Sequence, residues 1–184
     1  MSRLDRAGTF LLVIDVQERL VPAIDQHVLL LQNIERLIRG ARVLELPMLV
    51  TEQYPQGLGH TVDPVRSALQ DAQAQPAIEK ATFSAWRSAE FQTALRLLQK
   101  KQAIVSGIES HVCVYQTVSD LLENGFAVTV VDDAVSSRTQ RNQQIGVRRM
   151  LAEGASLSST EMVLFELTRT SGSDEFRAIS KLVK

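Results

Sequence analysis

The chain alternates between short runs of apolar residues and longer segments in which apolar residues recur at helical spacing. Short continuous apolar runs are typical of strands that are buried on both faces of a sheet. The runs that predict strands are Phe10–Ile14, Met48–Val50, a weak one at Ala77–Lys80, Ala103–Val105, Phe126–Val131 and Ala155–Leu157. Each of them is followed by a more polar stretch, so the strands are separate elements rather than one long apolar segment.

Apolar residues at helical spacing predict helices in the intervening segments. These segments are Leu29–Leu44, Phe91–Leu98, Val112–Leu122, Gln140–Glu153, Glu161–Leu167 and Ser173–Leu182. Gly125 and Gly154 follow two of them, and glycine commonly ends a helix. Ser159 or Thr160 is expected to cap the helix that begins at Glu161. Residues 53–75 show no strong period, so we expect a long loop there with one short helix.

Strands that alternate with helices predict a mainly parallel sheet covered by helices on both faces. The expected fold class is therefore α/β, with three layers in the order α/β/α. The chain has 184 residues, of which 45% are hydrophobic and 22% are charged. This length and balance suit one globular domain over residues 1–184, with enough apolar material for a full core.

Charge and cysteine content limit the partners and the compartment. The formal net charge is −1, which gives no electrostatic support for nucleic acid binding. Cys113 is the single cysteine, so no intrachain disulfide can form and nothing points to an oxidising compartment. The apolar run at Phe10–Ile14 is interrupted by Asp15 and is too short for a signal peptide or a membrane span. We therefore expect a cytoplasmic protein without nucleic acid or membrane partners.

Three reactive side chains follow predicted strands. Asp15 comes directly after the first strand, Lys80 ends the third, and Cys113 follows the fourth at the start of a helix. Ligands of open parallel sheets bind at the carboxyl ends of the strands. A helix N-terminus and a nearby ammonium both favour a thiolate, so we expect the pKa of Cys113 to lie below the free value of about 8.5.

Each of these residues also has an ordinary structural interpretation. A lone cysteine is most often a small buried hydrophobe. An aspartate after a strand often forms a turn, and Asp132 and Asp133 are interpreted as turn formers at the end of the fifth strand. His111 lies two positions before Cys113, so on a helix the two side chains face nearly opposite ways and a Cys–His dyad is not expected.

Three segments in register resemble the isochorismatase-like hydrolases, and in particular the isochorismatase domain-containing proteins. The segments are Leu12-Val-Ile-Asp-Val-Gln17, Glu79-Lys-Ala-Thr-Phe-Ser84 and Ser106-Gly-Ile-Glu-Ser-His-Val-Cys-Val114, within a match over roughly residues 8 to 160. The resemblance implies six parallel strands in the order 3-2-1-4-5-6 and a catalytic set of Asp15, Lys80 and Cys113. It also implies a cis peptide between Ile108 and Glu109, which directs the N–H groups of Glu109 and Cys113 at an oxyanion.

Departures from the family pattern narrow the expected chemistry. Metal-dependent nicotinamidases carry Asp-x-His after the second strand, whereas this chain has Thr51-Glu-Gln-Tyr-Pro-Gln-Gly-Leu-Gly-His60. Only His60 could serve as a ligand, so we expect neither a metal nor another cofactor. Some isochorismatases lack the cysteine and cleave an enol ether by acid catalysis. Because Cys113 is present, we expect hydrolysis of a C–N bond in a small molecule through a thioester.

The remaining expectations concern the pocket, the assembly and the alternatives. The candidates for lining the pocket are Gln17, Tyr54, Phe83, Trp86 and Thr117. Core packing is as good an interpretation for Phe83 and Trp86, and Gln17 is expected to support the site rather than to react. The resemblance implies a homo-oligomer. Two other functions stay open: enol-ether cleavage with Asp15 as the acid, and a redox-responsive protein without turnover.

Overall fold

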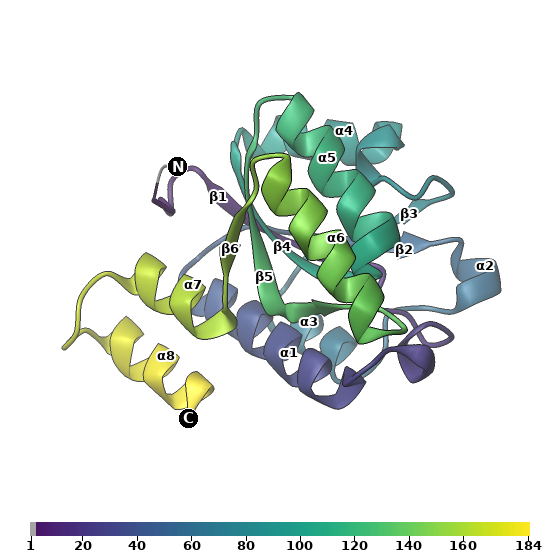
Figure 1. Cartoon of the computed structure of the whole chain (residues 1–184). Helices are drawn as coiled ribbons and strands as arrows, with labels where there is room; N and C mark the ends of the chain where they lie inside the picture. Colours follow the sequence, from purple (N-terminus) through teal and green to yellow (C-terminus); the bar gives the residue numbers. More distant parts are fainter. Residues whose placement is uncertain (1–2) are drawn as a thin grey trace.

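The central sheet has six strands, and all of its pairings are parallel (Figure 1). A computed structural model describes residues 3–184. The strands are β1 Thr9–Ile14, β2 Met48–Gln53, β3 Ile78–Lys80, β4 Gln102–Ile108, β5 Ala127–Ser136 and β6 Ser156–Ser158. Their order in the sheet is β3-β2-β1-β4-β5-β6. The predicted fold class and strand order are therefore confirmed.

Helices cover both faces of this sheet (Figure 1). They are α1 His27–Val43, α2 Pro55–Leu58, α3 Val65–Asp71, α4 Ala89–Leu98, α5 Tyr115–Glu123, α6 Gln140–Ala152, α7 Thr160–Thr168 and α8 Asp174–Val183. Short turns of helix are η1 Val21–Ala23, η2 Ala85–Arg87 and the π-helical η3 Ser110–Val114. None of the helices in the described part of the chain is long and apolar enough to cross a membrane.

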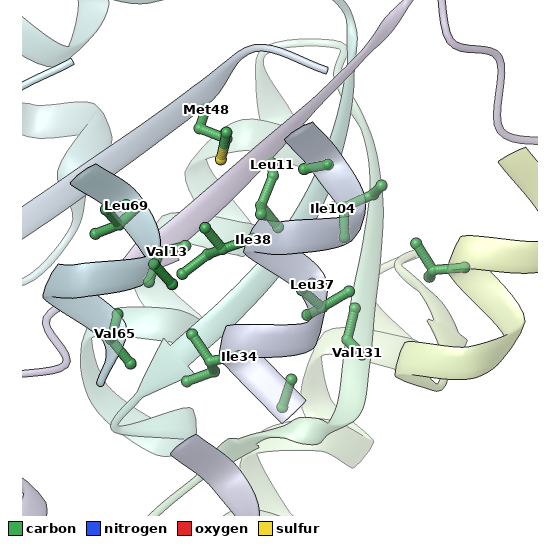
Figure 2. Packing of buried hydrophobic residues seen from close by; sticks show 14 of the residues in the cluster. Leu11, Val13, Ile34, Leu37, Ile38, Met48, Val65, Leu69, Ile104 and Val131 are labelled. Carbon is green, nitrogen blue, oxygen red and sulfur yellow. The ribbon is translucent and has the colours of Figure 1, made fainter. Parts of the chain in front are cut away.

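The core is divided by the sheet into two clusters, and β1 contributes to both. Leu11 and Val13 pack under α1, α3, α7 and α8, as Figure 2 shows for the α1 and α3 side. Phe10, Leu12 and Ile14 pack on the opposite face, against α4, α5 and α6. Because side chains alternate along a strand, a fully apolar strand supplies both layers of the core. The apolar sequence of β1 therefore places this strand between the two helical layers.

Several predicted boundaries differ from those of the structure. The strand predicted to end at Val131 continues to Ser136, so the interpretation of Asp132 and Asp133 as turn formers is wrong. The register between β4 and β5 shifts after Val105, which allows the strand to continue past the two polar residues. The loop over residues 53–75 holds two short helices rather than one. Ser159 is the cap of α7, where its side chain accepts a hydrogen bond from the N–H of Met162.

Gly107 allows β1 and β4 to approach closely at the edge where they end. It pairs with Ile14 and has a φ of +116°. A Cβ at this position would lie 2.1 Å from the backbone oxygen of Ile14. Only glycine combines that backbone conformation with so little space. The residue therefore determines how the two central strands meet just before Asp15 and Ile108.

We expect Gly107→Ala to lower the free energy of unfolding by about 3 kcal/mol or more, because the new methyl group collides with backbone. Gly125→Ala is the matched control. Gly125 also has a positive φ, of +77°, but nothing lies within 4 Å of its Cβ position. That substitution should lower the free energy of unfolding only by the cost of holding alanine in a left-handed backbone conformation, about 1–2 kcal/mol. Urea unfolding of both variants measures the difference, and equal losses would contradict the close approach.

Candidate active site

The carboxyl ends of the strands bring Asp15, Lys80 and Cys113 together. Asp15 follows β1, Lys80 ends β3, and Cys113 lies in η3 after β4. The side chains of Asp15 and Lys80 expose no surface, and Cys113 is 7% exposed. The charge of Asp15 and that of Lys80 both act on the thiol of Cys113. The cluster thus consists of a buried carboxyl group, a lysine amine and a thiol at the carboxyl ends of the strands.

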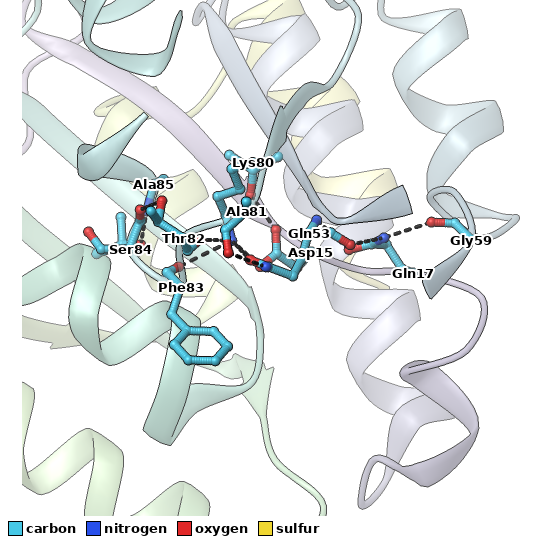
Figure 3. Close-up of polar contacts among 12 residues, drawn as sticks. Asp15, Gln17, Gln53, Gly59, Lys80, Ala81, Thr82, Phe83, Ser84 and Ala85 are labelled. Carbon is cyan, nitrogen blue, oxygen red and sulfur yellow. Dashed lines mark hydrogen bonds and ion pairs between the residues drawn. The ribbon is translucent and has the colours of Figure 1, made fainter. Parts of the chain in front are cut away.

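The Lys80 ammonium is surrounded by oxygen acceptors (Figure 3). Its Nζ donates to Oδ2 of Asp15 at 2.6 Å and to Oε1 of Gln53 at 2.7 Å. It also lies 3.2 Å from the backbone oxygen of Thr82 and 3.1 Å from that of Phe83. A buried charge is tolerated only when it is paired and hydrogen-bonded. These contacts therefore satisfy the donors of Lys80 and fix its side chain in place.

Asp15 is held from two sides. Its Oδ2 accepts from Lys80, and its Oδ1 accepts from the hydroxyl of Thr51 at 2.7 Å. The residue has a φ of +52°, in the left-handed region that aspartate tolerates better than most residues. The backbone N–H of Asp15 donates to the oxygen of Thr51, which continues the strand pairing. Thr51 was not among the predicted site residues, although it lies near the carboxyl end of the neighbouring strand.

The environment of Cys113 differs from the sequence-based expectation. Burial is the main cause that raises the pKa of the thiol, and the negative charge of Asp15 is the next. Lys80 acts in the opposite direction, but the pKa still rises to about 12. The expected lowering below the free value is therefore wrong. The effect of Lys80 does not offset the loss of water around the thiol and the opposing effect of Asp15.

The turn before Cys113 contains the cis peptide bond between Ile108 and Glu109. The carboxylate of Glu109 accepts from Nε of Arg138 at 3.0 Å and from its backbone N–H at 3.2 Å. The backbone oxygen of Glu109 accepts from the N–H of Val114, which closes the π-helical turn. In the same turn the hydroxyl of Ser110 is buried and lacks a hydrogen-bond partner among the described residues. A free polar group thus lies three positions before the thiol.

Gln17 connects the site to the loop after β2 (Figure 3). Its Nε2 donates to the backbone oxygens of Gly59 and Gln53, and its Oε1 accepts from the N–H of Gln53. Gln53 in turn accepts from Lys80 and donates to the backbone oxygen of Ala81 at 2.8 Å. Sequence reasoning missed Gln53. The rule that places reactive side chains at strand ends also applies to β2 and would have found it.

Residues 9–162 match the family described as the Isochorismatase domain. The chain belongs to the isochorismatase family. It is 36% identical to a secreted isochorismatase effector of Phytophthora sojae, over 100% of this chain and 88% of that protein. It is 35% identical to isochorismatase domain-containing protein 2 of Danio rerio, over 100% of this chain and 90% of that protein. The likeness to isochorismatase domain-containing proteins is thereby confirmed.

Solved structures of relatives share the whole fold. A structure described as a ribonuclease from Caenorhabditis elegans superposes with a TM-score of 0.90 at 36% identity, covering 99% of this chain and 92% of that one. The YcaC gene product of Escherichia coli, described as an octameric hydrolase of unknown specificity, gives 0.91 at 27% identity, covering 99% and 89%. The family and these neighbours support a hydrolase of this superfamily.

The predicted pocket residues of this family member lie in different surroundings. Phe83 and Tyr54 are exposed, at 54% and 58%. Trp86 packs edge-on against Phe126 at 5.8 Å between ring centroids, so its side chain packs against the core as one of the two interpretations predicted. Thr117 is buried, and its hydroxyl accepts from the N–H of Ala85 at 2.9 Å. The exposed aromatics remain available to a ligand, whereas Trp86 and Thr117 are occupied by packing and by a hydrogen bond.

The loop that carries a metal motif in some family members holds an ion pair here. Nδ1 of His60 lies 2.9 Å from Oε2 of Glu52, and Oε1 of Glu52 accepts from the N–H and hydroxyl of Thr61. Burial raises the pKa of Glu52, but these hydrogen bonds outweigh it and leave the pKa below its ordinary value. Within residues 3–184, no group of three or more His, Cys, Asp or Glu side chains has the arrangement of a metal site.

The pKa of Cys113 can be tested by alkylation with iodoacetamide across a pH series. Because the thiol pKa is raised, the rate should still climb at pH 9–10 instead of reaching a plateau near the free value of about 8.5. Asp15→Asn should lower the midpoint, because it removes a negative charge beside the thiolate. Lys80→Ala should raise the midpoint, because it removes the positive charge. A wild-type midpoint below the free value would show that burial does not dominate.

Proposed function

We propose that the protein is a cysteine hydrolase that cleaves a C–N bond of a small amide-type substrate through a thioester at Cys113. The observation that carries this proposal is the buried ion pair of Lys80 and Asp15 beside the single thiol. A carboxylate next to a thiol can take its proton, and the Lys80 ammonium holds the carboxylate of Asp15 in a fixed position.

Acylation begins with the neutral thiol, because its pKa is about 12. The proton of Cys113 passes to Asp15 as the sulfur attacks the substrate carbonyl carbon, so a free thiolate does not accumulate. The carbonyl oxygen becomes an oxyanion, and the backbone N–H groups of Glu109 and Cys113 at the start of η3 are proposed to stabilise it. Collapse of this intermediate breaks the C–N bond, and Asp15 returns the proton to the departing nitrogen. The products of this half are an amine and a thioester.

Hydrolysis of the thioester uses the same groups. Asp15 takes a proton from water as the water oxygen attacks the thioester carbon. The carbon–sulfur bond then breaks, Asp15 protonates the sulfur of Cys113, and the carboxylic acid leaves. Lys80 exchanges no proton in this scheme, and its contacts with Gln53, Thr82 and Phe83 hold it against Asp15 in both halves. The cycle needs water alone as its second substrate.

The two other functions have weaker support. A redox-responsive thiol is expected to be exposed and to have a low pKa, whereas Cys113 is buried and its pKa is raised. Enol-ether cleavage by Asp15 alone gives no role to Cys113, the single cysteine of the chain, which lies in the turn after β4 close to Asp15 and Lys80. The Phytophthora sojae relative is named as an isochorismatase, so enol-ether cleavage is the alternative outcome of the kinetic test.

Kinetics of variants test the proposed roles on a panel of small amides. Cys113→Ala should abolish turnover, and Cys113→Ser should be nearly as inactive, because a hydroxyl is far harder to ionise. Asp15→Asn should reduce kcat by about 10²–10⁴-fold, the usual contribution of a general base. The double variant of Asp15→Asn and Cys113→Ala should be little worse than Cys113→Ala, since residues that act as a unit are not additive.

Mass spectrometry of the wild type during turnover provides the direct readout. An acyl group on the peptide that contains Cys113 is expected, and thiol-free variants serve as the blank. Cys113→Ala with near wild-type turnover would move the chemistry to Asp15 and favour the enol-ether reaction. Turnover of RNA by the wild type, with none of the amides, would overturn the proposal in favour of the activity that describes the Caenorhabditis elegans neighbour.

We further propose that the protein is a homo-oligomer, as the octameric Escherichia coli neighbour is. In α6, Val147 and Met150 pack into the core, but Ile145 is 44% exposed and lies on the outer face. Static light scattering should give a mass of at least twice the 20.4 kDa of one chain, and Ile145→Glu should lower that mass if α6 contributes to the interface. A mass of one chain at every concentration would contradict this.

We also propose that the protein is cytoplasmic, because its single cysteine gives no sign of an oxidising compartment. One relative, in contrast, is a secreted effector. Cell fractionation with an antibody against the untagged protein distinguishes the two locations.

A further inference from the structure

A groove of about 600 Å³ lies between the segment after Lys80 and helix α5. We call it the Phe83–Gln116 groove. It is lined by Ala81, Thr82, Phe83, Ser84, Arg87, Tyr115, Gln116, Ser119 and Asp120. Its volume is within the usual range for sites that bind small molecules. None of its lining residues belongs to the proposed catalytic set, so its role is not explained by the chemistry above.

Both walls of the groove continue directly from the proposed catalytic residues. One wall begins at Ala81, next to Lys80, and the backbone oxygens of Thr82 and Phe83 lie within 3.2 Å of the Lys80 Nζ. The other wall includes Tyr115 and Gln116 in the first turn of α5, which directly follows the turn that holds Cys113. The groove therefore lies between the two segments that carry Lys80 and Cys113 into the site.

The charges within the groove cancel. Among its lining residues, the charged side chains are Arg87 and Asp120, and they bind each other through two hydrogen bonds of 2.9 Å. Asp120 is 8% exposed and also accepts from the hydroxyl of Ser84 at 2.6 Å. The hydrogen bonds from Arg87 are the main cause that lowers the pKa of Asp120. The carboxylate of Asp120 therefore stays ionised, and its negative charge balances the positive charge of Arg87.

The uncharged surfaces of the groove suit a planar or apolar group. The Phe83 side chain is 54% exposed beside the site, where Figure 3 shows its ring extending away from the hydrogen-bonded backbone. On the other wall, the ring of Tyr115 is held by Arg149, which lies 4.4 Å above it. The hydroxyl of Tyr115 donates to Glu153 at 2.8 Å, so that end of the ring is already bound.

We propose that the Phe83–Gln116 groove binds the non-reacting part of the substrate and selects an uncharged, planar or apolar group. Phe83 supplies the contact surface, and the Arg87–Asp120 pair keeps the groove free of net charge. The inference rests on the proposed function, because it takes Cys113 as the reacting atom. It also favours a neutral amide over a carboxylate-bearing molecule such as isochorismate, since the Lys80 charge is already bound to Asp15.

Matched alkylating probes test the charge preference without requiring turnover. N-(4-carbamoylphenyl)iodoacetamide and N-(4-carboxyphenyl)iodoacetamide have nearly the same shape, and only the second is an anion. Their rates with Cys113, each divided by the rate with N-acetylcysteine, should favour the neutral probe in the wild type. Asp120→Asn leaves Arg87 unpaired and should shift this ratio toward the anion by roughly fivefold, or about 1 kcal/mol. Arg87→Gln leaves Asp120 unpaired and should shift the ratio the other way.

Glu175→Gln is the matched control, because it frees Arg6 from a bidentate pair that involves no groove residue. It should leave the ratio unchanged. Circular dichroism checks that each variant is folded. Phe83→Ala should slow the neutral probe relative to iodoacetamide, whereas Leu97→Ala, which removes a side chain that is 81% exposed on α4, should not.

The inference is overturned if folded Asp120→Asn and Arg87→Gln both keep the wild-type ratio, or if Phe83→Ala does not slow the neutral probe. The proposed function fails by a different result, which is turnover that persists in Cys113→Ala. The two failures are separate, since the alkylation ratios need only a reactive thiol and the kinetic test needs only a substrate.

Discussion

The contact between Lys80 and Asp15 is the constraint on which the rest of the site depends. Both side chains are fully buried, and a buried charge that loses its partner costs about 3–5 kcal/mol. Such a pair is stable only when further hydrogen bonds satisfy the remaining donors and acceptors. Gln53, Thr51 and two backbone oxygens do this, and Gln17 in turn fixes Gln53. The polar network extends outward from one ion pair until it reaches the loop at Gly59.

The strand order makes this contact possible. Asp15 directly follows the central strand β1, which lies between β2 and β4, so its carboxylate has neighbours on both sides. Lys80 comes from the edge strand β3 and reaches across β2 to meet it. Cys113 comes from the other side, after β4, where Gly107 permits the backbone of β1 to lie close. A sheet with its switch point elsewhere would separate these three residues.

Much of this arrangement is readable in the sequence, and the reasons for the exceptions are physical. Apolar runs and helical spacing identify the strands and helices, and residues that directly follow strands identify Asp15 and Lys80. The sequence does not reveal how deeply a side chain is buried, so the raised pKa of Cys113 was missed and the choice between pocket and core for Trp86 stayed open. The extension of β5 through Asp132 and Asp133 depends on a register shift against β4, which no local pattern encodes.

Hydrogen bonds outside the sheet also connect the two sides of the site. Lys80 and Cys113 follow strands β3 and β4, which are not neighbours, so the twist of the sheet alone would leave their separation free to vary. The segment after Lys80 is tied back to α5, however, by the bond from Ala85 to Thr117 and by those from Ser84 and Arg87 to Asp120. This bridge spans the two strands that intervene in the sheet. These bonds therefore restrict how far the segment after Lys80 can separate from the helix that follows Cys113.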